Sequence, residues 1–448
     1  MSTQVEAPRR PRWVIVLCLI LAVVFVAALS VYLYVRPILR TGTGYAAHNL
    51  CALTEIADRG NAETDLPPNP LVPYLSQYNN RNGYTYVSVL GLLAGQTAYY
   101  TQGYGCTIAA RPPAFEPPEP VPPTMLLTED PRLDPSLDEA IGRAFGDHLP
   151  DGEVAALGTR AVVVVKDGEI VGERYADGFT SNTAQLGWSM TKSVTNLLVG
   201  RAVMQGALTP EDSNLRPEWT DQRAEITVDD LMRMTSGLEW DETYELGSPI
   251  TKMLFDTDDM AGYVAGLPAA HEPGTFEQYS TGSSVLACAV LNDRLGGGPT
   301  MPREQLFAPL GLASAVLEPD ASGTPVCGSY LWATPRDWAR IGQFVLDDGV
   351  VDGQRLLPEG WIEESTTVTP VDSTDPSSAN YGASWWVNHR ADGSLVHPEL
   401  PADTFWADGH DGQRMFIVPS ERLVVLRMGF TPVARDLDLI QLVNTAIG

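Results

Sequence analysis

Residues 161–176, AVVVVKDGEIVGERYA, decide the fold because two β-rich runs flank the turn Asp167-Gly168 and predict a β-hairpin. A second pair of apolar runs, QRMFIVPSERLVVLRMG at 413–429, lies near the other end of the chain. The segments between them predict helices, one of which begins near Ser189. We therefore expect an α+β fold in which both hairpins share one antiparallel sheet and helices cover it.

Residues 13–35, WVIVLCLILAVVFVAALSVYLYV, form an uncharged apolar stretch. A helix needs about 20 such residues to cross a hydrocarbon layer of about 30 Å, so this stretch predicts a transmembrane anchor. Three arginines within residues 1–12 favour a cytoplasmic tail and export of the rest to the periplasmic or extracellular face, although Arg36 and Arg40 weaken that orientation. A cleaved signal peptide is the alternative, but its apolar region usually spans about 7–15 residues.

The remaining chain divides by composition. Residues 36–110 contain short apolar runs and predict a small module behind the membrane. Residues 111–124 are rich in proline and predict an extended linker or a strap across the next domain. Residues 125–448 form the main domain, which opens with a helix candidate at 135–145 and closes with another from about Ala434.

Four of the five cysteines lie outside the apolar stretch. In an oxidising compartment Cys51 and Cys106 could pair and close a loop worth about 4 kcal/mol by chain entropy. Cys288, within SSVLACAVL, is interpreted as a buried apolar residue, and Cys327 as either buried or paired with another thiol. The adjacent acids Asp241-Glu242 are interpreted as a solvated turn, and no metal or organic cofactor is expected.

The balance of charge constrains the partners of the chain. The formal net charge is −27, and the arginines near the N-terminus make the rest of the chain still more acidic. Such a surface repels phosphate backbones, so nucleic acid is not expected as a partner.

The segment GWSMTKSVTNLLVG places Ser189 three residues before Lys192. At helical spacing these side chains share one face, so the amine can reach the hydroxyl. A lysine with a depressed pKa can remove the serine proton and create a nucleophile. The chain holds only three lysines among 29 basic residues, which makes this spacing informative and indicates a role that needs a group able to lose its proton.

Two further segments support this site. Tyr279 lies in a loop before a helix candidate, and a tyrosine beside an ammonium group can have its pKa lowered enough to act as a general base. Residues 409–413, GHDGQ, precede a predicted strand, and a glycine-flanked strand start can supply an amide to an oxyanion. An aromatic residue packing a helix start and an ordinary polar turn are the alternatives.

The order of these motifs resembles the class C β-lactamase-like serine hydrolases, the penicillin-recognising superfamily that also holds esterases, D-amino-acid peptidases and 6-aminohexanoate-dimer hydrolase. The resemblance extends from about Ala161 to Leu426 and implies an antiparallel sheet with helices on both faces and a helical subdomain. It rests on six segments, which are WSMTKS (188–193), ITVDDLMRMTSGLEWDE (226–242), EPGTFEQYSTGSSVLA (272–287), YLWATPRDWARIGQFVLDDG (330–349), YGASWWV (381–387) and ADGHDGQRMFIVPSERLVVL (407–426).

The resemblance implies a role for each matching catalytic position. Ser189 corresponds to the acylated nucleophile, Lys192 to its activator and Tyr279 to the tyrosine of the Y-x-N motif. The implied oxyanion hole consists of the backbone amides of Ser189 and Gln413.

The implied substrate-binding positions depart from the pattern of β-lactamases. Thr281 stands where the Y-x-N motif has asparagine. The run from His410 to Gly412 matches the K-T-G motif in its H-x-G form, which lacks the cation that would bind a β-lactam carboxylate. We therefore expect a small-molecule ester or linear amide as substrate.

Other functions stay open at this point. D,D-peptidase or β-lactamase activity would use the same nucleophile. A Ser-His-Asp triad would use Ser189 in a near G-x-S-x-G context with His410 as base. An exported, non-catalytic protein that binds peptidoglycan or a partner is the alternative outside enzymes.

Overall fold

The computed structural model describes residues 12–60, 65–80, 83–122, 132–369, 371–373, 380–432 and 437–448. Most of the predicted cytoplasmic tail, the end of the proline-rich segment, the start of the main domain at 125 and the start of the closing helix near Ala434 therefore lie outside the described residues. The closing helix itself, α12, spans Leu439–Ile447.

A six-stranded antiparallel sheet forms the centre of the main domain. Its strand order is β14-β15-β16-β17-β5-β6, and β17 pairs with β5 from Leu423 opposite Lys166 onward. This pairing joins the two predicted hairpins and confirms that both ends of the domain share one sheet. The strands are β14 Trp386–Val387, β15 Phe405–Gly409, β16 Gln413–Val418, β17 Leu423–Gly429, β5 Thr159–Lys166 and β6 Glu169–Tyr175.

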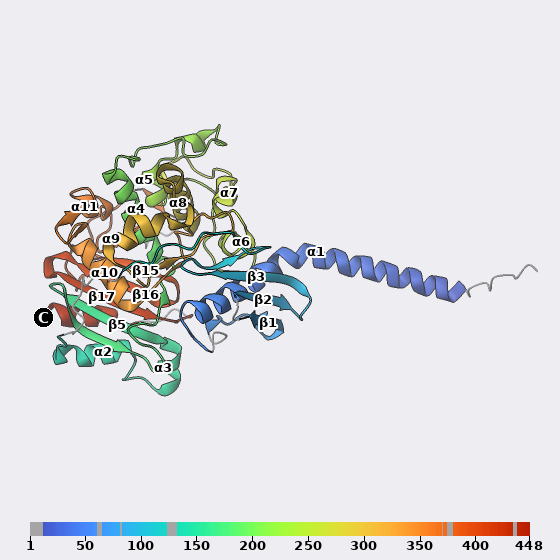
Figure 1. Cartoon of the computed structure of the whole chain (residues 1–448), viewed down its shortest axis with the longest axis horizontal. Helices are drawn as coiled ribbons and strands as arrows, with labels where there is room; N and C mark the ends of the chain where they lie inside the picture. Colours follow the sequence, from blue (N-terminus) through green and yellow to red (C-terminus); the bar gives the residue numbers. More distant parts are fainter. Residues whose placement is uncertain are drawn as a thin grey trace, which may run out of the picture.

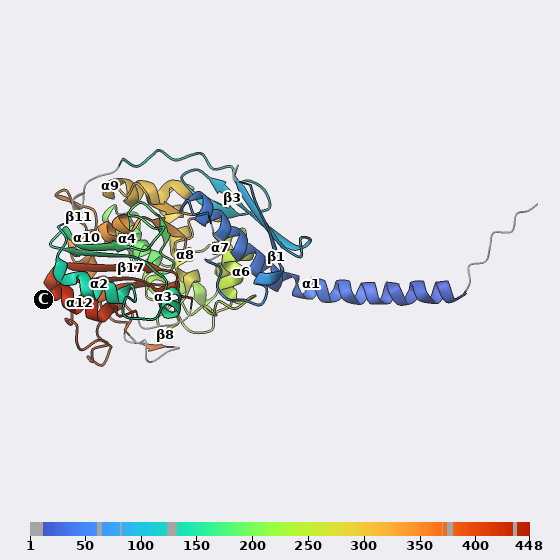
Figure 2. The ribbon, with the colours of Figure 1, turned by 90° about the horizontal axis from the view of Figure 1, so that it is seen from below.

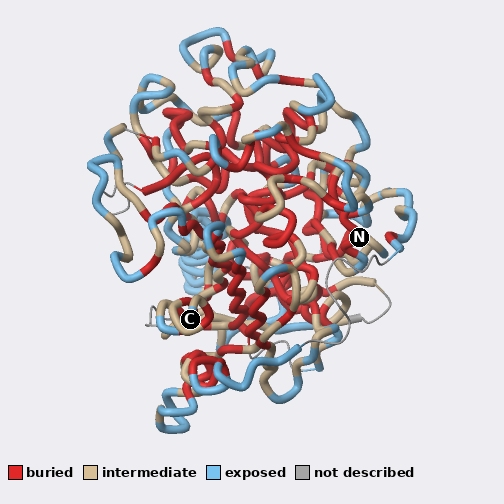
Figure 3. The backbone as a smooth tube through the Cα atoms, turned by 90° about the vertical axis from the view of Figure 1, so that its left-hand side faces the viewer, coloured by how far each residue is buried: buried red, intermediate tan, exposed pale blue. Residues whose placement is uncertain are grey.

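Strand β5 shows why helices cover both faces of this sheet. Successive strand residues point to opposite faces, so Val163 and Val165 enter one apolar cluster while Val162 and Val164 enter another. The helices α2 (Asp138–Ala144) and α12 pack on the second face, and α4 (Met190–Met204) and α10 (Pro335–Leu346) on the first. Figure 3 shows the resulting buried interior.

A helical region lies beyond the first face of the sheet (Figure 1). Short strand pairs tie its loops together, including β7 with β10 just before the start of α4. The helices are α5 Val228–Met232, α6 Pro249–Asp256, α7 Met260–Ala265, α8 Thr281–Leu295, α9 Ala308–Leu310 and α11 Trp361–Ser365, with α3 Asp151–Leu157 near the sheet. The short strands are β7 Gln185–Leu186, β8 Phe276–Glu277, β9 Val316–Leu317, β10 Leu331–Ala333, β11 Val350–Val351, β12 Gln354–Arg355 and β13 Asp372–Ser373.

The N-terminal helix α1 is continuous from Arg12 to Glu55. Its first half projects from the body, and its second half packs against both the main domain and a four-stranded sheet (Figures 1 and 2). The helix therefore continues past residue 35, where composition alone placed the end of the anchor. The strands of this sheet are β1 Leu75–Asn80, β2 Tyr84–Val89, β3 Leu93–Thr101 and β4 Gly105–Ile108.

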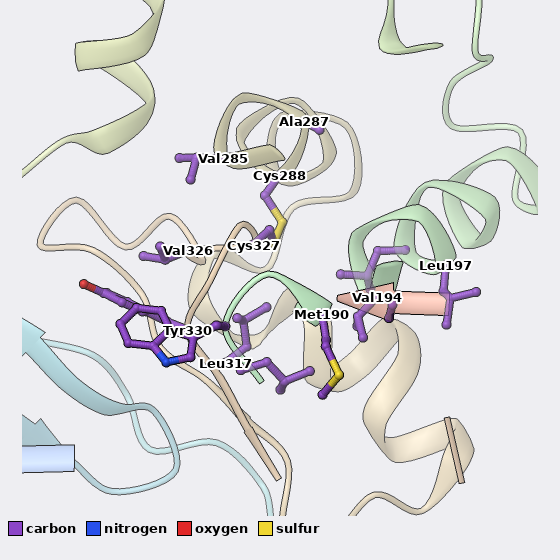
Figure 4. Close-up of a cluster of buried hydrophobic side chains, with 14 of the residues drawn as sticks. Met190, Val194, Leu197, Val285, Ala287, Cys288, Leu317, Val326, Cys327 and Tyr330 are labelled. Atoms are coloured by element: carbon purple, nitrogen blue, oxygen red, sulfur yellow. A yellow bond between two sulfur atoms is a disulfide. The ribbon is translucent and has the colours of Figure 1, made fainter. Parts of the chain in front are cut away.

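Two disulfides crosslink the described part of the chain. Cys51 on α1 and Cys106 on β4 are bonded, with their Cα atoms 6.1 Å apart. Cys288 on α8 is bonded to Cys327, with a Cα separation of 5.9 Å (Figure 4). Cys288 is buried as expected, but it is not simply an apolar residue, because the packing of α8 brings it against a segment that is distant in sequence.

The described part of the proline-rich segment, residues 111–122, has no helix or strand. It runs along one edge of the molecule between β4 and α2 (Figure 2). The ring of Phe115 packs edge-on against Tyr104 at 5.7 Å between centroids. The segment thus lies against the folded body as a strap.

Candidate active site

Ser189 lies at the start of α4, the helix predicted from its sequence. The preceding residue, Trp188, has a φ of 47°, an uncommon conformation for a large side chain that turns the backbone sharply into the helix. Lys192 Nζ lies 2.8 Å from Ser189 Oγ. The i, i+3 spacing thus brings the two groups together, as the sequence predicted.

Lys192 is buried, with only 1% of its surface exposed. Its Nζ also donates to Thr281 Oγ1 at 2.8 Å and to the carbonyl oxygen of Gly328 at 3.0 Å. Burial lowers the pKa of Lys192 to about 8, and the negative charges of Glu242 and Asp408 oppose that shift. Near neutral pH part of the amine is therefore neutral and able to accept a proton.

Tyr279 lies next to this pair. Lys192 Nζ is 4.8 Å from the centroid of its ring, and the ring stacks on Trp386 at 5.6 Å. The pKa of Tyr279 is raised well above its ordinary value, chiefly by burial and then by the charge of Glu242, while a hydrogen bond to Ser189 acts in the opposite direction. The expected lowering of the pKa of Tyr279 is wrong here, because burial and the charge of Glu242 raise it. Tyr279 stays a phenol and can donate a proton.

Glu242 is a site residue that the sequence did not identify. Its Oε1 accepts a short hydrogen bond from Thr281 Oγ1, and its Oε2 accepts from the Thr281 amide at 2.9 Å. The distance from its Oε1 to Lys192 Nζ is 3.9 Å. Glu242 is therefore part of the site and not of a solvated turn, since the loop before α6 folds back onto the start of α8. No local pattern reveals that long-range contact.

The predicted substrate-binding run follows β15. The ring of His410 stacks on Tyr244 with centroids 4.4 Å apart and meets Trp188 edge-on at 5.5 Å. Lys192, rather than His410, occupies the position against Ser189 Oγ. The geometry thus favours a Ser-Lys arrangement over the Ser-His-Asp alternative.

The end of β15 lies beside the turn that carries Ser189. A side chain at Gly409 would collide with the carbonyl oxygen of Gly187, so the two backbones are in close contact. Gln413 pairs with Gly409 from the next strand, and its side chain bonds Gly429 on β17. Gly412 lies close to Arg427. On this side of the Ser189 turn the close contact is therefore made by the backbone of Gly409, and the predicted oxyanion role of Gln413 stays a prediction.

The sequence of the chain is similar to those of known proteins. Residues 152–432 match the sequence model of the family described as Beta-lactamase. The chain is 24% identical over 294 residues to the 6-aminohexanoate-dimer hydrolase of Paenarthrobacter ureafaciens, a match that covers 59% of this chain and 74% of that protein.

Two solved structures share the fold. A putative 6-aminohexanoate-dimer hydrolase from Bacillus anthracis superposes with a TM-score of 0.58 and 20% identity, over 73% of this chain and 88% of that one. A family VIII carboxylesterase gives a TM-score of 0.54 and 18% identity, over 71% of this chain and 98% of the other.

Proposed function

Since the chain belongs to the beta-lactamase family and is a serine hydrolase, we propose that it cleaves an ester or a linear amide through an acyl-enzyme on Ser189. The 2.8 Å approach of Lys192 Nζ to Ser189 Oγ is the observation that carries this proposal. The amide hydrolase and the carboxylesterase among its relatives support the substrate class.

The reaction has two steps. Neutral Lys192 takes the proton of Ser189 as Oγ attacks the substrate carbonyl. As the bond to the leaving group breaks, Tyr279 gives its proton to the departing alcohol or amine and is reprotonated from the Lys192 ammonium, so that both groups return to their starting forms. Water then attacks the acyl-serine ester, which releases the carboxylic acid and restores the hydroxyl of Ser189. The amide of Ser189, together with an amide at the β15–β16 turn, would hold the oxyanion.

Glu242 and Thr281 position the base in this scheme. The Thr281 hydroxyl accepts from Lys192 and donates to Glu242, which fixes the amine toward Ser189. His410 stands where a β-lactam carboxylate would meet a lysine, so a neutral ester or amide suits the site better than a β-lactam.

Substitution of the nucleophile tests the proposal. We expect Ser189→Ala to lower the hydrolysis of p-nitrophenyl acetate by at least about 10³-fold and to abolish labelling by a fluorophosphonate probe. Ser193→Ala, one turn further on α4, is the matched control for labelling. Unchanged ester hydrolysis in the Ser189 variant would overturn the assignment, and efficient nitrocefin turnover by the wild type would overturn the substrate class.

We also propose that α1 anchors the enzyme in a membrane with the catalytic domain exported. Among the described residues α1 is the one helix long and apolar enough to span a bilayer, with a mean hydropathy of 3.3 in its most apolar part. The disulfides support this location, because such bonds persist in oxidising compartments.

A further inference from the structure

The turn between β2 and β3 exposes two leucines to solvent. Leu90 is 67% exposed and Leu92 is 81% exposed. Leu90 also has a φ of 54°, in the left-handed region where glycine or asparagine is favoured. A bulky apolar side chain that is this exposed gains little from packing within the folded chain. Its presence at such a position indicates that it contacts a membrane or another molecule.

This turn lies beside the projecting half of α1. The amide of Ala94 donates to the hydroxyl of Tyr32, which belongs to the apolar stretch 13–35, at 3.1 Å. The amide of Leu90 donates to the carbonyl oxygen of Tyr74, whose ring is 57% exposed. The two leucines and Tyr74 therefore lie on the side of the body near the apolar stretch of α1, and tyrosine is a residue favoured at membrane interfaces.

A cavity of about 230 Å³ lies between the second half of α1 and the segment 66–75, which carries Tyr74. The segment that carries Tyr74 forms one wall, and α1 contributes a second wall through Gly42, Tyr45 and Ala46. Most of the other lining groups are apolar and include Leu66, Leu71, Val72, Leu75, Leu246 and Phe255. An apolar cavity of this kind suits an alkyl chain better than a polar peptide.

Two of the lining residues lie next to the active site. Tyr244 and His410 line it, and both rings pack against Trp188, the residue before Ser189. The lining of the cavity thus runs from the second half of α1 and the segment before β1 to the aromatic rings beside Trp188.

We infer that the substrate is a bilayer-borne amphiphile, an ester or amide whose alkyl chain lies in this cavity while its carbonyl reaches Ser189. The inference rests on the proposed hydrolase function and on the anchor. Ser189 Oγ bonds to the carbonyl carbon as the ester or amide bond breaks, the serine proton leaves with the alcohol or amine, and water releases the acid. The exposed leucines insert into the interface and hold the body, with this cavity, against the lipid.

The experiment compares two substrates with one reporter group. The full-length protein is reconstituted in phosphatidylcholine vesicles and assayed with p-nitrophenyl acetate in solution and p-nitrophenyl palmitate in the bilayer. We expect the double variant Leu90→Asn with Leu92→Ser to lower palmitate hydrolysis about tenfold and acetate hydrolysis less than about twofold. Val72→Trp, which fills the cavity, should lower the palmitate-to-acetate ratio by a similar factor.

Leu133→Ser is the matched control, since Leu133 is 55% exposed and lies shortly before α2 in the sequence. Figure 1 shows α2 on the side of the body away from the projecting helix. It should leave both rates unchanged. Equal effects of the double variant on both substrates, or wild-type activity on acetate without activity on palmitate, would overturn the inference while leaving the hydrolase function intact. If acetate hydrolysis persisted in Ser189→Ala, the proposed hydrolase function on Ser189 would itself be wrong.

Discussion

At the scale of single residues, the properties of the site depend on how burial and charge act on one amine. Removing Lys192 from water disfavours its ammonium form, and nearby carboxylates partly restore it. A lysine with a pKa of about 8 is a base that works near neutral pH, which an exposed lysine is not.

The pH dependence of acylation follows from this balance. We expect kcat/KM for a neutral ester to rise with pH and level off above about 8, because the neutral amine is the active form. Glu242→Gln removes a charge that favours the ammonium form, so the pKa of Lys192 falls and the rising limb moves to lower pH. The measurement is a rate profile from about pH 5.5 to 9.5. Asp241→Asn, at an exposed neighbour, serves as control, and an unmoved limb in Glu242→Gln would contradict the role of Glu242.

A second prediction concerns the contact between Gly409 and Gly187. We expect Gly409→Ala to push β15 away from the Ser189 turn and to lower kcat about 10²-fold with a smaller effect on KM. Gly152→Ala is the control, because nothing lies within 4 Å of the added carbon. Wild-type kinetics in the Gly409 variant would show that this close approach is not needed for catalysis.

Sequence reasoning could place the serine and the lysine because i, i+3 spacing is a local property of a helix. The shared sheet was also predictable, since alternating apolar residues and turns mark strands in the sequence itself. The role of Glu242 and the pairing of Cys288 with Cys327 depend instead on segments that meet only after folding. The pKa of Tyr279 was predicted with the wrong sign, because proximity to an ammonium is visible in a motif while the extent of burial is not.

At the scale of elements, α1 and the small sheet are joined covalently at one point. The bond between Cys51 and Cys106 links residues 55 apart in sequence. In the chain-entropy model, a crosslink over this span raises the free energy of the unfolded chain by about 4 kcal/mol. The second half of α1 thereby stays docked against β4 and keeps its place in the wall of the cavity.

Removal of this disulfide should loosen the small sheet. We expect the double variant Cys51→Ala with Cys106→Ala to lose about 2–4 kcal/mol of unfolding free energy and to show an earlier thermal transition. Calorimetry of the detergent-solubilised full chain provides the measurement. Cys18→Ala is the control, since Cys18 is exposed and unpaired in the structure. A variant with unchanged thermal unfolding would mean that packing alone holds α1 in place.

At the scale of the whole molecule, a chain with a net charge of −27 carries its acidic body on an apolar helix. Attachment through such a helix depends on apolar burial and not on attraction to anionic lipids, which would repel the body. We expect the protein to stay in the membrane fraction after washing with 1 M salt or alkaline carbonate, as immunoblotting of the pellet would show. Release by salt would indicate peripheral attachment.

The course of α1 has a mechanical consequence. α1 contains Pro37 and changes direction where it enters the body (Figures 1 and 2), and its second half forms part of the cavity wall. If its first half spans a bilayer as proposed, a change in the tilt of that half would move the cavity relative to the lipid headgroups. A helix tilts to match its apolar length to the local hydrocarbon thickness. Turnover of a lipid-borne substrate would then vary with the acyl length of the host lipids, and hence with the thickness of the membrane.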